Sequence, residues 1–141
     1  MIEDQSGTKL LMDYGLAPTK PPRYPSEAPV IDHAIITHSH IDHIGMAPWL
    51  VGHHGTTLHG SRLTSGLSEI MWRDTYKVSS IEGYPLAWDR RDLDAALEAW
   101  QEHGMGDLFS IGAWDAKFHV AGHIPGAVMT EMDVNLSLIH I

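Results

Sequence analysis

One run of residues, His38-Ser39-His40-Ile41-Asp42-His43, restricts the possible folds of this chain more than any other feature. It directly follows Ala34-Ile35-Ile36-Thr37, a short apolar and β-branched segment of the kind expected for a strand buried on both faces. Side chains alternate along a strand, so the first two histidines can project to the same side. The aspartate and the last histidine follow where the chain turns toward a helix. Imidazole and carboxylate groups bind zinc, manganese or iron, so the run predicts a site for one or two cations.

The rest of the sequence alternates between strand and helix signals, which favours a mixed α/β layered domain without internal repeats. Strands are expected around a turn within 2–14, at 30–37 and at 56–60, and a hairpin is expected over 111–120. Helices are expected over 44–51, after Thr64 as a cap, and after Asp89 with Gly104 as the stop. The segment 16–29 is rich in proline and predicts an irregular loop.

Composition excludes several classes of protein. The chain has 43% hydrophobic residues, and no apolar stretch is long enough to span a bilayer or to form a secretion signal. It has no cysteine, which excludes disulfides and thiolate metal sites and fits a reducing cytoplasm. A formal charge of −9 is unlike that of a clamp that neutralises nucleic-acid phosphates, whereas carboxylates gathered around cations would produce it. We therefore expect a cytoplasmic metalloprotein without a membrane partner.

The run His38 to His43 resembles the H-x-H-x-D-H motif of the metallo-β-lactamase superfamily. Asp13-Tyr14-Gly15 resembles the first motif of that family, and Ala121-Gly122-His123-Ile124-Pro125-Gly126-Ala127 resembles its third. The third motif has the form typical of the β-CASP ribonucleases, the branch that includes the nuclease of 3′-end cleavage and polyadenylation. The resemblance implies the N-terminal part of an αββα sandwich, with a mixed sheet and flanking helices, in a truncated fragment of a longer enzyme.

The resemblance also implies roles for individual residues. His38, His40 and His123 would bind one metal ion, and Asp42 and His43 would bind a second, with zinc as the expected metal. Asp42 would also be catalytic, since it could orient the nucleophile or take its proton. Asp13 would orient ligands from behind them, although a turn aspartate that caps the backbone is an equal interpretation. The implied reaction is cleavage of an RNA phosphodiester by a metal-activated hydroxide.

Two other functions fit the same residues. A metallo-hydrolase of this fold could act on a small thioester or ester, because fold does not determine substrate. An inactive scaffold subunit of a cleavage complex is the third interpretation, although the intact motif is unusual for one. The aspartate of the fourth family motif cannot be placed, because Asp133 lies too close to the third motif. We therefore expect an incomplete second metal site and little activity from this chain alone; the oligomeric state is not predicted.

The last residues form a separate feature. The chain ends in Leu136-Ser137-Leu138-Ile139-His140-Ile141. This segment back-translates naturally to CTG TCT CTT ATA CAC ATC, which resembles a transposon end used to prepare sequencing libraries. The expected organisation is an incomplete metallo-β-lactamase-fold domain over 1–135 and an adapter-derived sequence over 136–141. The alternative is a genuine apolar terminal strand.

Overall fold

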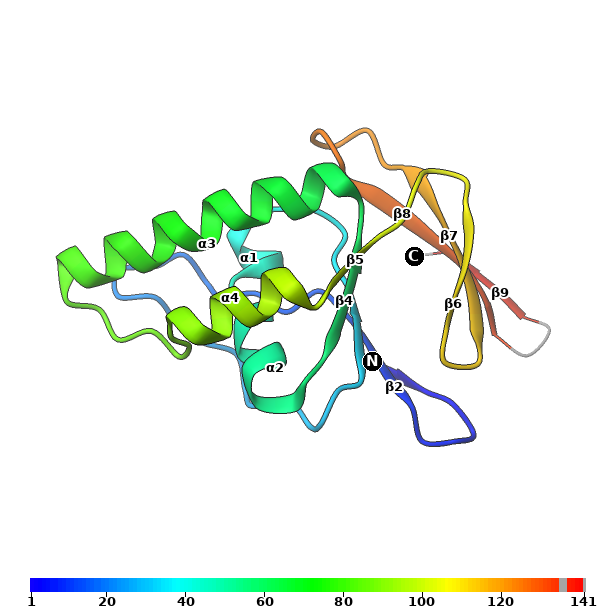
Figure 1. Cartoon of the computed structure of the whole chain (residues 1–141), viewed down its shortest axis with the longest axis horizontal. Helices are drawn as coiled ribbons and strands as arrows, with labels where there is room; N and C mark the ends of the chain where they lie inside the picture. Colours follow the sequence, from blue (N-terminus) through cyan, green and yellow to red (C-terminus); the bar gives the residue numbers. More distant parts are fainter. Residues whose placement is uncertain (135–136, 141) are drawn as a thin grey trace.

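The computed structural model describes residues 1–134 and 137–140, and it arranges them in three layers (Figure 1). A central sheet contains β1 (Ile2–Glu3), β2 (Lys9–Met12), β3 (His33–Ile35), β4 (Thr57–Gly60) and β5 (Trp100–Glu102) in that spatial order. β1 is antiparallel to β2, and β2 to β5 run parallel. The expected mixed sheet is confirmed.

The other two layers cover the two faces of the central sheet. On one face lie α1 (Ile41–Ile44), α2 (Ala47–His54), α3 (Arg62–Glu82) and α4 (Arg90–Glu98). On the other lies an outer antiparallel sheet of β6 (Leu108–Ile111), β7 (Trp114–Val120), β8 (Val128–Val134) and β9 (Ser137–His140). The described residues thus supply the helix-sheet-sheet part of the expected αββα sandwich.

The apolar segment at β3 is buried on both faces, as its sequence predicts. Ala34 packs with Leu58 in the core between the helices and the central sheet. Ile35 packs with Leu10 in the second core, between the two sheets. Successive side chains of one strand therefore anchor different layers, which fixes the end of β3 in place.

Two buried tryptophans hold the region after α1 against the long helix. The indole Nε1 of Trp72, on α3, donates to the carbonyl oxygen of Ile44 at 2.9 Å. Trp88 donates in the same way to the carbonyl oxygen of Gly45 at 2.7 Å. Each indole satisfies a carbonyl at the end of the short α1, so tertiary packing stabilises a helix too short to form alone.

Several sequence-based predictions of element boundaries are wrong. The expected helix over 44–51 is two helices, α1 and α2, separated at Gly45 and Met46. Ser61, not Thr64, caps α3, because the Ser61 side chain accepts a hydrogen bond from the Thr64 backbone N–H. The helix that begins after Asp89 ends at Glu98, well before Gly104, and Trp100–Glu102 is strand β5. Pairing with β4 outweighs the helical spacing of the apolar residues there.

The terminal strand β9 lies at the edge of the outer sheet. β9 pairs with β8. A genuine terminal strand and an adapter-derived sequence could both pair in this way, because a sheet edge presents open backbone groups. The predicted junction at Asn135 and Leu136 lies outside the described residues, so the adapter interpretation stays a prediction.

Within residues 1–134 and 137–140, none of the helices has the length and apolar character needed to cross a bilayer.

Candidate metal centre

The histidine run lies where the chain leaves the central sheet at the end of β3. The backbone N–H of Ile36 still donates to the His59 carbonyl oxygen of β4 at 2.8 Å. The Thr37 carbonyl oxygen accepts from the Val128 N–H at 2.9 Å, which attaches the start of β8 and the loop before it. His40 remains extended and is the N-cap residue of α1. The sheet, a helix and a loop of the outer sheet therefore meet at this run.

Three imidazoles converge there from distant parts of the chain. His38 Nε2 lies 3.1 Å from His40 Nδ1. His123 Nε2 lies 3.4 Å from the same His40 nitrogen, although it is 83 residues away in sequence. His38 is buried, while His40 and His123 are exposed. The nitrogens therefore form a cluster with one side open to a ligand.

The chemistry of this donor set fits a cation. Nitrogens bound to a tetrahedral zinc ion at about 2.0–2.1 Å lie roughly 3.3 Å from one another. The two distances at His40, 3.1 and 3.4 Å, are close to that separation. No carboxylate oxygen is among the three donor atoms that face one another here, so the cluster is neutral when its imidazoles are. The three converging imidazoles are a candidate site for a divalent transition metal.

Asp13 lies behind the cluster and fixes the orientation of two rings. Its Oδ1 accepts from the Thr37 backbone N–H at 2.8 Å, and its Oδ2 accepts from the Thr37 hydroxyl at 2.7 Å. The same Oδ2 accepts from His43 Nδ1 at 2.8 Å. The carboxylate is thus occupied by partners of its own, which is the arrangement expected of a residue that orients ligands.

These contacts determine which nitrogens remain as lone-pair donors. Because the Thr37 hydroxyl donates to Asp13, it accepts from His38 Nδ1, which lies 2.9 Å away. His38 Nδ1 and His43 Nδ1 therefore carry the ring protons. The Nε2 atoms of His38 and His43 are left unprotonated and available to a metal ion.

Asp42 and His43 extend the cluster on the side of α1. His43 Nε2 lies 3.8 Å from Asp42 Oδ2, and the His38 and His43 ring centroids are 4.0 Å apart. The Asp42 carboxylate is more than half exposed, beside a cavity of about 480 Å³ that Arg23 and Tyr24 also line. Asp42 and His43 would offer a second cation at this end one carboxylate and one imidazole, and one ligand atom each of Asp13, His38 and His43 also lie within 4.8 Å of one another.

Burial keeps the innermost ring neutral. Desolvation is the main cause that lowers the pKa of His38, and the neighbouring His43 lowers it further, against an opposing effect of Asp13. A neutral imidazole is the form that binds a metal, so His38 is ready to bind at neutral pH.

The backbone around Asp13 is strained and closely packed. Asp13 has a φ of 52°, in the left-handed region that non-glycine residues seldom adopt. At Gly15, an added Cβ would lie 1.9 Å from the backbone oxygen of Asp42. Glycine is required at position 15 because the segment after β2 lies directly against α1, and this contact brings Asp13 under His43.

A second group of histidines was not predicted from the sequence. His59 Nε2 lies 3.1 Å from His33 Nδ1, and His59 Nδ1 lies 3.0 Å from His103 Nε2. These side chains form an imidazole chain across β3, β4 and the end of β5, separate from the metal cluster. Each histidine looks like an isolated strand or surface residue in sequence, and His103 directly follows β5 instead of lying in the helix expected to stop at Gly104. Only the pairing of the parallel strands shows that these three imidazoles lie next to one another.

Two further metal-capable side chains, His119 and Asp133, lie on the outer sheet. His119 pairs with Glu131 at 2.8 Å on the outer sheet. Asp133 lies on β8 and lines a separate cavity with Asp115 and Glu131, so it does not supply the missing fourth-motif ligand.

The family comparison is unambiguous. A model of the metallo-beta-lactamase superfamily matches residues 2–129 of the chain, and members of that superfamily generally bind divalent metals. Among solved structures, a metallo-beta-lactamase from Cronobacter sakazakii superposes with a TM-score of 0.60 at 15% identity, over 93% of this chain and 50% of its own. At that identity the structural likeness supports the fold alone.

Curated relatives give a different kind of similarity. The chain is 26% identical over 132 residues to RNase aCSPSF2 of Saccharolobus solfataricus, covering 90% of this chain and 26% of that protein. It is 26% identical over 138 residues to Cleavage and polyadenylation specificity factor 73 of Drosophila melanogaster, covering 91% of this chain and 20% of that protein. The chain therefore spans about a quarter of the length of these relatives or less.

Proposed function

We propose that this chain, which belongs to the metallo-beta-lactamase superfamily, is part of a metal-dependent hydrolase that cleaves the phosphodiester backbone of RNA. One observation supports the proposal above all others: one donor nitrogen each of His38, His40 and His123 lie within 4.8 Å of one another, with His40 Nδ1 in hydrogen-bonding range of the other two. This convergence joins a local motif to a loop 83 residues further along the chain.

We assign two divalent cations, most simply zinc, to the cluster. His38, His40 and His123 would hold the first, and Asp42 with His43 would hold the second. An imidazole-rich donor set without thiolate suits zinc, as imidazole is one of its common ligands. Cations bound there would supply Lewis-acid chemistry, lowering the pKa of water and offsetting charge that develops on a phosphate.

The protein residues would perform the remaining tasks. Thr37 and Asp13 hold His38 and His43 with their Nε2 atoms free, so the ligands need no reorganisation on binding. Asp42 is exposed beside a cavity and would orient the nucleophile or accept its proton. The exposure of His40 and His123 leaves the cluster accessible to a polymeric substrate.

The choice of RNA is supported by the relatives. The similar curated proteins include an RNase and a cleavage and polyadenylation specificity factor, in agreement with the β-CASP resemblance of the third motif. An RNA substrate is therefore preferred over a small thioester or ester. The complete donor set from His38 to His43 disfavours the inactive-scaffold alternative, because a scaffold has no need to keep oriented ligands.

Metal binding is the first test. The 141-residue chain, dialysed against zinc and then against buffer, should retain zinc by elemental analysis. His123→Ala should lose most of it, whereas His119→Ala removes an imidazole on the outer sheet and should not. Equal zinc content in the two variants would contradict the proposed ligand set.

RNA cleavage is the second test, made on the complete gene product with a fluorophore-quencher RNA. Asp42→Asn should lower the rate by at least about a hundredfold, the lower end for loss of a positioned acid or base. Hydrolysis of a thioester but not of RNA by the metal-loaded protein would refute the RNA assignment. The 141-residue chain alone is expected to turn over little RNA, since a fourth-motif ligand is not found among its described residues.

A further inference from the structure

A second cavity opens beside the loop that carries His123, and its lining residues are all different from those of the cavity beside Asp42. It has a volume of about 410 Å³ and lies between the loop that follows β7 and the start of α3. Ile124, the residue after His123, forms part of its wall. Because Ile124 follows His123 in the chain, a ligand in this cavity would lie beside the proposed metal site.

Exposed apolar side chains gather around this cavity. Leu63 of α3 is 59% exposed, Met105 before β6 is 41% exposed, and Val120 at the end of β7 is 67% exposed. They come from three separate elements, yet each contributes to the same wall. A contiguous apolar surface of this kind on a charged protein indicates a binding site.

The cavity is preformed, because its walls are fastened to each other. The carbonyl oxygen of Gly126 accepts from the hydroxyl groups of Ser61 and Thr64 at 2.7 and 2.9 Å. Gly126 has a φ of +86°, and an added Cβ would lie 2.8 Å from the Leu63 Cβ. The loop that carries His123 is therefore fixed to the start of α3. Its order before binding reduces the conformational entropy that a ligand would cost.

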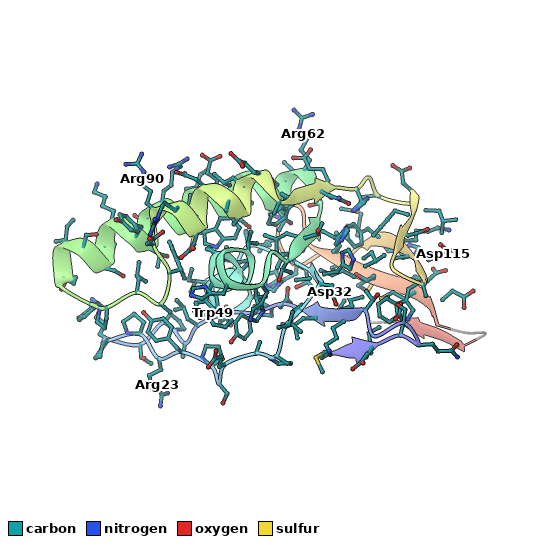
Figure 2. All side chains as sticks on the ribbon, turned by 60° about the horizontal axis from the view of Figure 1, so that its bottom comes forward. Arg23, Asp32, Trp49, Arg62, Arg90 and Asp115 are labelled. Atoms are coloured by element: carbon teal, nitrogen blue, oxygen red, sulfur yellow. The ribbon has the colours of Figure 1, made fainter. Side chains whose placement is uncertain are left out.

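A cationic side chain stands at the rim. Arg62 lines the cavity at the first residue of α3, and Figure 2 shows its side chain projecting away from the ribbon. Within the part of the chain that the structure describes, Arg62 has no carboxylate within ion-pair distance. Its guanidinium is thus available to a phosphate, which it can bind through two parallel hydrogen bonds.

We propose that this cavity seats one nucleobase of the RNA substrate, next to the phosphate that is cleaved, while Arg62 contacts a flanking phosphate. The inference rests on the proposed function and assigns it a substrate-binding position. A heteroaromatic base is smaller than this cavity of about 410 Å³, so a base with part of its ribose can lie among its apolar side chains, and the sugar-phosphate backbone can pass beside Arg62. Base burial against side chains is largely independent of sequence, so the cavity would bind RNA without strong base preference.

The test compares intact and abasic RNA on the metal-loaded chain. Binding of a fluorescein-labelled hexamer is followed by anisotropy, for the intact RNA and for the same RNA with single abasic positions. Loss of one base should weaken binding about tenfold at one position, within the range for a single stacked base. Equal affinity at every abasic position, or no binding of RNA by the zinc-loaded chain, overturns the proposal.

Matched variants locate the effect. Val120→Asp places a carboxylate in the cavity and should abolish the difference between intact and abasic RNA. Met129→Asp changes a residue of similar exposure on the adjacent strand, outside the cavity, and should preserve it. Arg62→Gln should weaken intact and abasic RNA equally and reduce the salt dependence of binding.

Zinc content, measured on each variant, separates the two proposals. A Val120→Asp chain that retains zinc and binds intact RNA as tightly as the wild type refutes the base site and leaves the proposed function standing. Wild-type chain that fails to retain zinc refutes the proposed function instead. Self-association of the wild type that Val120→Asp removes, without a change in RNA affinity, would assign the apolar wall to a protein contact and overturn the base site.

Discussion

Acid should destabilise the fold through the buried imidazole chain, chiefly through His59. His59 is only 2% exposed, and its nitrogens are paired with His33 and His103. Burial is the main cause that lowers the pKa of His59 from its ordinary value of 6.5 to about 3, and the neighbouring histidines contribute to the shift. Between these values the unfolded chain binds a proton at this position that the folded chain does not.

The sign and size of the effect follow from linkage. Stability is full above the unfolded pKa and falls as the pH drops toward the folded pKa, by about 1.4 kcal/mol per pH unit for one proton. Between pH 7.5 and 5, His59 alone should therefore cost about 2 kcal/mol of unfolding free energy. Burial also lowers the pKa of His33 and of His103, opposed by Asp32 and Asp107 respectively, so the neighbours add to the loss.

The assay is urea unfolding followed by tryptophan fluorescence at pH 7.5 and pH 5, with a chelator present to exclude metal effects. His59→Gln should reduce the pH-dependent loss by about 2 kcal/mol, whatever its effect on stability at pH 7.5. His53→Gln changes an exposed histidine at the end of α2 and serves as the control. The reasoning fails if wild type and His59→Gln lose the same stability between the two pH values.

Three further substitutions test how the site is built. Asp13→Ala removes the acceptor of His43 and Thr37, and should weaken zinc binding about 10- to 100-fold by calorimetry without removing a ligand; unchanged affinity would contradict the orienting role. Gly15→Ala places a methyl group against the Asp42 backbone. It should lower the free energy of unfolding in urea by about 1–3 kcal/mol and weaken zinc binding. A stability equal to that of the wild type would show that this contact does not hold α1. Trp72→Ala should cost about 3–5 kcal/mol, because it empties a fully buried position and leaves the Ile44 carbonyl unpaired; a loss under 1 kcal/mol would refute this.

The sequence by itself determined the features that are local in the chain. An apolar strand followed by His38, His40, Asp42 and His43 predicted metal-binding side chains at the end of a strand, since strand alternation places residues two apart, such as the first two histidines, on one side. The alternation of strands and helices predicted the mixed α/β fold, which the superfamily match confirms. The expectation that His123 lies beside these residues came from its resemblance to a family motif.

Tertiary structure decided what depends on contacts between distant segments. The strand at Trp100–Glu102 forms because β4 offers it a partner, and no spacing within the segment could reveal that. The imidazole chain at His59 arises because parallel pairing aligns strands that are 24 residues apart or more. Asp13 reaches His43 because Gly15 lets its segment lie against α1, and its role in orienting ligands stays a prediction. Side-chain periodicity is a property of the local backbone, whereas these contacts depend on which surfaces meet once the layers have packed.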